Sequence, residues 1–213
     1  MDSIVARRHG PVEIRLVRAR DAKVLQQELL SNRAWLRRWE ATLPHSAVSF
    51  DMRVSIRRLL QQHRDGAGYP FVMEYDGEVT GQLNVWGVMR GSLGSATIGY
   101  WVSERYAGRG ITPAAVAMVT DLCFSELGLH RIEICIRPEN TASLRVVQKL
   151  GFRYEGLRRQ YIHIDGDWRD HLCFALVQSD VPEGVLRRWT EGRVPAEVSM
   201  VPPGDLPALD QRG

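Results

Sequence analysis

Two short segments of the chain combine residue types that could hold a phosphorylated ligand. The first is the loop R-Y-A-G-R-G-I-T, residues 105–112, between an expected strand and an expected helix. Its glycines, Gly108 and Gly110, let the backbone approach a ligand without side-chain obstruction. The first N–H groups of a helix have no intrahelical acceptors, and the helix dipole adds partial positive charge there. We therefore expect a phosphate or pyrophosphate at this loop.

The loop differs from two other phosphate-binding motifs. The G-x-G-x-x-G dinucleotide fingerprint is incomplete, and the preceding strands do not form βαβ units. No Lys-Ser or Lys-Thr pair follows, as a P-loop would require. An isolated G-x-G is also compatible with a plain helix entrance. The second segment, R-P-E-N-T-A-S-L-R-V-V-Q-K-L-G-F at residues 137–152, follows after one expected helix and one expected strand.

Together the two segments resemble the cofactor motifs of the GNAT acyltransferase superfamily. The loop fits the pattern R/Q-x-x-G-x-G/A, and the second segment is similar to N-x-x-[AS] followed by K-x-G-F. The resemblance covers residues 12–177 and implies acetyl-CoA as the acetyl donor. It also implies an α+β fold with flanking helices. Its mixed, mostly antiparallel sheet would have about seven strands and a V-shaped splay between the fourth and the fifth.

The resemblance further implies where acetyl-CoA binds. The pyrophosphate would lie on backbone N–H groups of the loop, and the pantetheine would pair with the splayed strand like an added β-strand. An N–H near Val102 would polarise the thioester carbonyl. Asn140 would hydrogen-bond the pantetheine or the thioester end. The residues expected to contact acetyl-CoA are Tyr100, Trp101, Val102, Arg105, Ala107, Gly108, Arg109, Gly110, Ile111, Thr112, Asn140 and Ser143.

Three further segments resemble a subgroup, the RimJ-type ribosomal-protein alanine N-acetyltransferases. They are N-R-A-W-L-R-R-W-E (32–40), M-R-G-S (89–92) and Y-I-H-I-D-G-D-W-R-D-H (161–171). The similarity to RimL-type, spermidine-acetylating and antibiotic-acetylating relatives is looser. The resemblance implies direct attack by the N-terminal α-amine of a ribosomal or other protein. A small-amine acetyltransferase (polyamine, amino acid or antibiotic) and a catalytically weak acyl-CoA-binding module are the alternatives.

The chain departs from the superfamily at two catalytic positions. Many members have a Tyr seven residues after the motif Asn, where this chain has Val147. Some N-terminal acetyltransferases have a Glu five residues before it, where this chain has Cys135. RimL-type relatives have a Ser three residues after it, and Ser143 matches, so we assign Ser143 to the departing thiolate. An α-amine, with a pKa of about 7.7–8.0, needs only a modest base.

Three residues are candidates for that base: Glu104, Tyr161 and His163. Glu104 directly follows an expected strand and is also compatible with a solvated loop carboxylate. Tyr161 and His163 share one face of an expected strand, so both could line the cleft or both could belong to a packed surface. Arg169-Asp170-His171 has the composition of a charge relay, but neighbours on a strand face opposite sides, which favours a structural cluster.

Trp39 and Glu40 are candidates for the acceptor site. In relatives the corresponding segment covers the acceptor mouth, and a carboxylate there would attract the α-ammonium group of a peptide. Trp35 and Trp39, spaced i and i+4, are alternatively core residues of one helix face.

Hydrophobic periodicity predicts the elements that position these residues. A helix between the fourth and fifth strands implies one parallel pair in an otherwise antiparallel sheet, and a cleft opens where these strands part. The first strand is expected at the sheet edge, and the long helix should have one apolar stripe. Expected strands are 13–18, 69–75, 78–86, 95–102, 131–137, 152–164 and 168–177; expected helices are 21–30, 32–40, 51–64, 110–127 and 141–150.

Composition divides the chain into a domain at 1–177 and an extension at 178–213. The 213 residues are 44% hydrophobic and 25% charged, which excludes disorder, collagen and coiled coil as descriptions of the whole. Five of the ten prolines lie in the extension, whose acidic composition favours mobility. The domain is mildly basic, which suits an anionic ligand but is weaker than expected of a nucleic-acid binder.

Three cysteines, Cys123, Cys135 and Cys173, lie among apolar neighbours without C-x-x-C spacing. We therefore expect core residues in a reducing compartment and no metal site. No apolar run approaches 18 residues and the amino terminus has no signal peptide, so we expect a cytoplasmic protein without membrane contact. The expected partners are acetyl-CoA and an amine acceptor, and the expected state is a monomer or homodimer.

Overall fold

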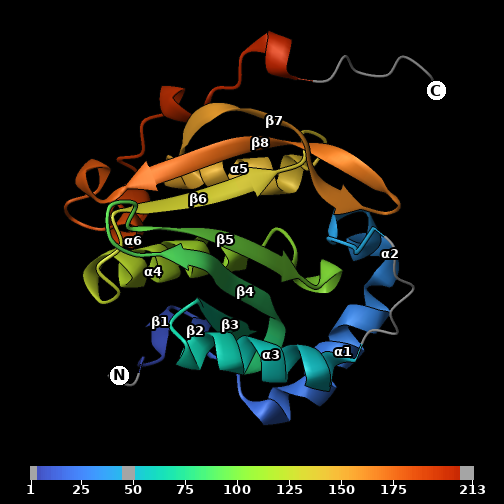
Figure 1. The fold of residues 1–213 in the computed structure, drawn as a ribbon. Helices are drawn as coiled ribbons and strands as arrows, with labels where there is room; N and C mark the ends of the chain where they lie inside the picture. The colour runs from blue at the N-terminus through green and yellow to red at the C-terminus, as the bar shows by residue number, and fades with distance from the viewer. Residues whose placement is uncertain (1–3, 45–50, 207–213) are drawn as a thin grey trace.

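A mixed sheet of eight strands organises the computed structural model, which describes residues 4–44 and 51–206. The strand order is β1-β2-β3-β4-β5-β6-β8-β7 (Figure 1). Only β5 and β6 pair in parallel among the described strands, so the α+β class and the mostly antiparallel sheet are confirmed. The strands are β1 (Arg7–His9), β2 (Val12–Leu16), β3 (Gly68–Tyr75), β4 (Glu78–Met89), β5 (Ser95–Val102), β6 (Arg131–Ile136), β7 (Arg153–Ile164) and β8 (Asp167–Val177).

Helices lie on both faces of this sheet (Figure 1). The α-helices are α1 (Ala22–Ser31), α2 (Arg33–Leu36), α3 (Met52–Arg64), α4 (Ile111–Ser125), α5 (Thr141–Leu150) and α6 (Val185–Thr190). The segment 32–40, predicted as one helix, continues from α2 into a 3₁₀ turn, η2 (Arg37–Trp39). A second 3₁₀ turn, η3 (Glu104–Tyr106), links β5 to the glycine loop.

The sheet differs from expectation at its first strands. The eighth strand is β1, whose three residues pair antiparallel with β2 and add one strand to the predicted total of about seven. The first expected strand was predicted at the edge of the sheet. That strand is β2, which lies between β1 and β3 and is therefore an interior strand. The strands expected at 69–75 and 78–86 pair as a hairpin, as do those expected at 152–164 and 168–177, and each pair is joined by an Asp-Gly turn. Asp76 and Asp165 have φ near +49°, which type I′ turns require.

Each face of the sheet has its own apolar core. The α4 and α5 face carries a cluster that includes Phe71, Leu83 and Phe152, all at most 1% exposed. The α1 and α3 face carries a smaller one around Leu25 and Ile56. The prediction of a single apolar stripe on α4 is wrong. Nearly all of its residues are buried, because α5 and α6 pack on it in addition to the sheet.

The strands β5 and β6 pair only briefly and then separate. Their parallel register covers Ser95–Thr97 against residues 131–133, and Ile98 to Val102 have no partner on β6. This is the V-shaped splay predicted between the fourth and fifth strands. Because β1 precedes them, the two strands are the fifth and the sixth in the structure. The splay leaves backbone groups of β5 free to pair with an extended ligand.

The extension after residue 177 packs on the domain as far as it is described. In α6, Val185 is fully buried against the main core. The carboxylate of Asp121 on α4 accepts hydrogen bonds from the N–H groups of Val185 (2.6 Å) and Leu186 (3.1 Å). Composition predicted mobility, and this is wrong for α6, because contacts with α4 and α5 hold it. The boundary at residue 177 itself stays a prediction.

Arg188 fastens this packing, and its removal should destabilise the fold. Its buried guanidinium donates to the carbonyl oxygens of Leu150 (2.6 Å) at the end of α5 and of Asp180 (3.2 Å). Arg188→Ala should lower the free energy of unfolding by about 2–3 kcal/mol in urea denaturation, because a buried carbonyl loses a charged donor. Arg187→Ala is the matched control, because the Arg187 side chain is exposed and bonds only Glu191 among the described residues; its effect should stay within about 0.5 kcal/mol. Equal effects would contradict the assignment.

Candidate functional site

A cavity of about 680 Å³ extends through the splay from one face of the sheet to the other. Its wall combines the tip of β5, the glycine loop, the first turns of α4 and α5, and residues of α1, α2, η2 and α3. Twelve of the residues expected at the site line it: Trp39, Glu40, Tyr100, Trp101, Val102, Ala107, Gly108, Gly110, Ile111, Thr112, Asn140 and Ser143. The structure therefore brings most of the two motifs and the acceptor segment into one cavity.

The glycine loop forms one end of the cavity. Gly110 caps α4 with φ 78° and Gly108 has φ 79°, both in the left-handed region that glycine adopts without strain. A Cβ at either position would meet nothing within 4 Å, so the backbone conformation and not crowding selects glycine. Successive N–H groups in such a turn form a concave anion site at the positive end of the helix dipole.

The edge of β5 supplies backbone groups to the middle of the cavity. The Ser103 N–H donates to the carbonyl of Thr80 on β4 (2.8 Å). Alternate residues of an antiparallel strand direct their N–H groups to the same side. The N–H of Trp101 therefore also points to β4, whereas the N–H groups of Tyr100 and Val102 point into the splay. The N–H of Val102 is therefore directed as an oxyanion donor would have to be.

Two hydroxyls lie beside this backbone edge. The hydroxyl of Tyr100 is buried and has no hydrogen-bond partner among the described residues. Burial raises the pKa of Tyr100, and the nearby Ser143 hydroxyl lowers it by less, so the phenol stays protonated. Asn140 caps α5 by accepting from the Ser143 N–H (3.1 Å) through its side-chain oxygen, which leaves its amide nitrogen for other contacts.

The other end of the cavity lies on the face covered by α1 to α3. Gln82 and Asn84, two positions apart on β4, project there with Trp101, and the Gln82 amide donates to the Asn84 oxygen (3.3 Å). Ser55 of α3 adds a hydroxyl. Among the described wall residues Glu40 contributes the only carboxylate, and its side chain bonds Arg33. This end therefore sets a few polar groups and one acidic group in a largely apolar wall, an arrangement that can take up an amine.

The helix α1 holds the loop that follows β5. The carboxylate of Glu28 accepts from the Ser103 hydroxyl (2.5 Å) and from the Arg105 guanidinium (2.7 Å). The side-chain oxygen of Asn32 accepts from the Glu104 N–H (2.8 Å). These bonds tie the entrance of the glycine loop to the helix layer on the acceptor face.

The acceptor segment after α2 is held by the β7–β8 hairpin (Figure 1). Arg37 bonds Asp165 (2.8 Å), and the Thr42 N–H donates to the carbonyl of His163 (2.8 Å). Just after β6, the Arg137 guanidinium donates to the carbonyl of Arg38 (2.7 Å). Trp39 and Glu40 therefore owe their position to contacts between segments far apart in the sequence.

The three candidate bases do not line the cavity. His163 engages Thr42 through Nδ1 (2.7 Å to the hydroxyl), and its ring packs on Trp168. Tyr161 accepts from Arg158 (3.1 Å) and packs edge-on against His171. Glu104 is an exposed residue of η3. The structure thus gives Tyr161 and His163 packing contacts, and no described contact directs any of the three into the cavity.

Arg105 and Arg109 lie beside a smaller hollow of about 370 Å³. The guanidinium of Arg105 lies over the Tyr106 ring at 4.7 Å, and that of Arg109 lies over the same ring at 5.5 Å. Both flank the outer side of the glycine loop. Two other cations, Arg145 and Lys149 of α5, line the main cavity itself.

Sequence reasoning missed several wall residues. Gln82 and Asn84 carry a signal that could have found them, because two polar residues alternate on one face of a strand whose other face is apolar. Met52 and Leu59 carry no such signal, since apolar residues on a helix face look the same whether they meet a core or a cavity. The wall residues that were not predicted include Trp35, Met52, Ser55, Leu59, Gln82 and Asn84.

No helix in the described part of the chain is long and apolar enough to cross a membrane. Nor do three or more His, Cys, Asp or Glu side chains within residues 4–44 and 51–206 gather in a way that could hold a metal ion.

Comparison with known proteins identifies the family. Residues 12–153 match the acetyltransferase (GNAT) domain model. The [ribosomal protein uS5]-alanine N-acetyltransferase of Escherichia coli is 30% identical over 183 residues, which are 84% of this chain and 90% of that protein. The probable N-acetyltransferase YjcK of Bacillus subtilis is 40% identical over 105 residues, 49% of this chain and 58% of that protein.

A solved structure agrees with these matches. Mycobacterium smegmatis RimJ in complex with CoA-disulfide superposes with a TM-score of 0.79 at 39% identity, covering 85% of this chain and 88% of that chain. The chain therefore belongs to the GNAT acetyltransferase family and is an N-acetyltransferase that uses acetyl-CoA.

Proposed function

We propose that this N-acetyltransferase acetylates the N-terminal α-amine of a protein, in the manner of the RimJ type. The observation that carries the proposal is the composition of the cavity wall. Its acceptor end has one carboxylate, Glu40, together with the polar groups of Gln82, Asn84 and Ser55, and the described wall contains no histidine. A ribosomal protein is the acceptor suggested by the relative from Escherichia coli.

The donor end of the cavity fits acetyl-CoA. The open N–H nest at Gly108 and Gly110 suits a pyrophosphate, and Arg145 and Lys149 add positive charge beside it. Bound acetyl-CoA would supply the thioester acetyl group. The Val102 N–H would polarise the thioester carbonyl, and the amide nitrogen of Asn140 would hold the same end of the ligand.

The acceptor must lose a proton before or during its attack on the thioester. An α-amine with a pKa of about 7.7–8.0 is partly neutral at cellular pH, whereas a lysine amine near 10.4 is almost wholly protonated. A wall without a histidine therefore favours the α-amine, for which a water held by Gln82 or Asn84 suffices as proton carrier. The assignment of a base to Glu104, Tyr161 or His163 stays a prediction.

The test compares acceptors by the release of free CoA thiol. One panel holds peptides varied at their first two residues, each with an Nα-acetylated copy that contains an internal lysine; the other holds polyamines, amino acids and aminoglycosides. Turnover of the free peptides, and none of the blocked copies, is expected. Turnover of the small amines alone would replace the proposal by the small-amine alternative, and no turnover in either panel would favour an acyl-CoA-binding module.

The carboxylate of Glu40 should contribute to acceptor binding. Glu40→Gln should raise the Michaelis constant for an acceptor peptide about fivefold, which is ~1 kcal/mol, with little change in kcat, because a charge attraction to the α-ammonium is lost. The effect should shrink as salt is added. Steady-state kinetics with saturating acetyl-CoA measure both constants.

Glu126→Gln is the matched control for this substitution. Glu126 also pairs with a single arginine, Arg7, but lies outside the cavity wall. The Michaelis constant of the Glu126→Gln variant for the acceptor peptide should equal that of the wild type. An unchanged constant in Glu40→Gln as well would remove Glu40 from the acceptor site.

A further inference from the structure

Two thiols meet on the sheet outside the cavity. Cys135 of β6 and Cys173 of β8 are directly opposite one another in the antiparallel register, and their sulfur atoms are 3.1 Å apart. Both are free thiols. Sequence reasoning treated the two as separate core residues, because 37 residues lie between them and the pairing of β6 with β8 brings them together.

The backbone register places this pair where a cross-strand disulfide fits. The Gln178 N–H donates to the carbonyl of His130 (2.9 Å), which marks a hydrogen-bonded pair of the ladder. Hydrogen-bonded and non-hydrogen-bonded pairs alternate, so Cys135 and Cys173, five positions away, form a non-hydrogen-bonded pair. Such pairs have Cα atoms about 4.5 Å apart, within the range of about 4.4–6.8 Å that disulfides span.

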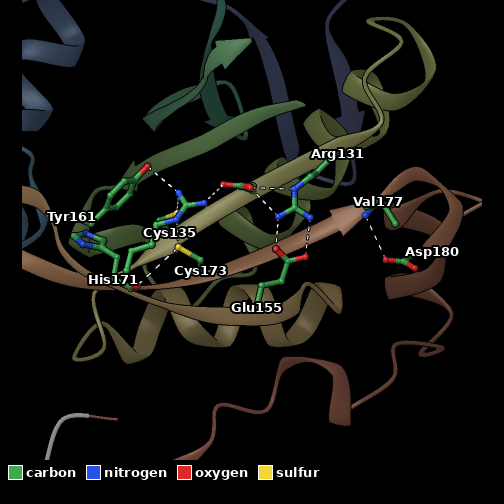
Figure 2. A network of polar contacts seen from close by, with 10 residues as sticks. Arg131, Cys135, Glu155, Tyr161, His171, Cys173, Val177 and Asp180 are labelled. Carbon is green, nitrogen blue, oxygen red and sulfur yellow. Dashed lines mark hydrogen bonds and ion pairs between the residues drawn. The ribbon is translucent and has the colours of Figure 1, made fainter. Parts of the chain in front are cut away.

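The surroundings of the pair favour a thiolate. The Arg158 guanidinium donates to the Cys135 sulfur at 3.6 Å and bonds Glu133 (2.9 Å) and Tyr161 (3.1 Å). Figure 2 shows the two sulfurs between Tyr161 and His171 on one side and the Arg131–Glu155 ion pair on the other. The thiol–thiol hydrogen bond lowers the pKa of Cys173 and raises that of Cys135, so the pair shares one proton after it ionises.

A small reagent can approach the pair. Cys135 is partly exposed, although Cys173 is only 6% exposed. On its other side Cys173 faces Gly156 of β7, where a Cβ would meet nothing within 4 Å. The third cysteine, Cys123, is fully buried in α4, and burial raises its pKa. The structure therefore separates one accessible dithiol from one inert thiol.

We propose that Cys135 and Cys173 form a redox-active dithiol that reacts with small-molecule disulfides. The pair loses one proton, and the proton that remains moves to Cys173 as Cys135, the more exposed sulfur, attacks one sulfur of R–S–S–R, forms a mixed disulfide and expels RS⁻. Cys173 then attacks the Cys135 sulfur, forms the intramolecular disulfide and expels the second RS⁻. Two electrons pass from the thiols to the reagent, and the two thiol protons end on the two RS⁻ groups. This site does not depend on the proposed acceptor.

The test uses oxidised glutathione on the whole protein. After incubation, free thiols are alkylated under denaturing conditions and the intact protein and its peptides are analysed by mass spectrometry. The wild type should lose two of its three alkylatable thiols and two hydrogens, with a peptide containing Cys135 joined to one containing Cys173. Dithiothreitol should restore all three thiols.

Variants identify the sulfurs. Cys123→Ser, the control, should lose both of its remaining thiols in the same way. Cys135→Ser should form no intramolecular link, and Cys173→Ser should stop at a glutathione adduct on Cys135. The decisive measurement is on the wild type, so it does not depend on the folding of a variant. Three alkylatable thiols after treatment, or glutathione adducts without the cross-link, would overturn the proposal.

Discussion

Replacing Gly110 by alanine should raise the Michaelis constant for acetyl-CoA about tenfold, because the cap of α4 needs a left-handed backbone. Gly110 has φ 78°, a conformation that costs an L residue about 1–2 kcal/mol. Without ligand, an alanine there can relax to a negative φ and turn the loop N–H groups away from the phosphate position. Binding must then restore the strained loop, and 1.4 kcal/mol corresponds to a factor of ten. Steady-state kinetics with varied acetyl-CoA measure the change.

The control for this substitution lies just beyond the other end of the same helix. Gly128 also has a positive φ, 64°, and a Cβ there would meet nothing within 4 Å. Gly128→Ala therefore carries the same backbone penalty without touching the cavity. It should lower the free energy of unfolding by about 1 kcal/mol and leave the Michaelis constant unchanged. Equal Michaelis constants in the two variants would show that the loop N–H groups do not bind the donor.

The fold followed from the sequence where local chemistry decides it. The Asp-Gly pairs at 76–77 and 165–166 join the expected strands, and the helix expected at 141–150 begins where Asn140 caps it, because turns and caps depend on nearby residues. The strand β1 was not predicted, since its three residues R-R-H show no alternation of apolar and polar side chains. The helix α6 was not predicted, because its stability comes from the hydrogen bonds to Asp121 and from contacts with α4 and α5, which composition cannot reveal.

The candidate site also has one part that local sequence predicts and one part that depends on tertiary contacts. Its donor end could be predicted, since the glycine loop and Asn140 act through local backbone geometry at helix starts. Its acceptor end could be predicted only in part, because Gln82 and Asn84 enter the wall through the pairing of β4 with β5. The alternating pattern placed Tyr161 and His163 on one strand face. It could not show that Arg158 hydrogen-bonds Tyr161 or that Thr42 hydrogen-bonds His163. Tertiary contacts therefore decide which polar residues are left to meet a substrate.

We propose that the hydroxyls of Tyr100 and Ser143 stabilise the departing thiolate. Superfamily members often carry a tyrosine where this chain has Val147, so this proton donor must come from elsewhere. The Tyr100 hydroxyl is buried and unpartnered among the described residues, and a buried donor without an acceptor costs free energy unless a ligand supplies one. Its raised pKa keeps the phenol protonated, so it can donate to a sulfur that gains charge.

Tyr100→Phe should therefore lower kcat about a hundredfold, with a much smaller change in the Michaelis constant for acetyl-CoA, because charge on sulfur develops only in the transition state. Ser143→Ala should lower kcat in the same direction. If the two hydroxyls act as one unit, the double variant should lose less than the product of the single losses. Tyr154→Phe is the control, since the Tyr154 hydroxyl bonds Asp205 (2.7 Å) outside the cavity and its loss should leave kcat unchanged. A wild-type kcat in Tyr100→Phe would mean that another donor serves the leaving group.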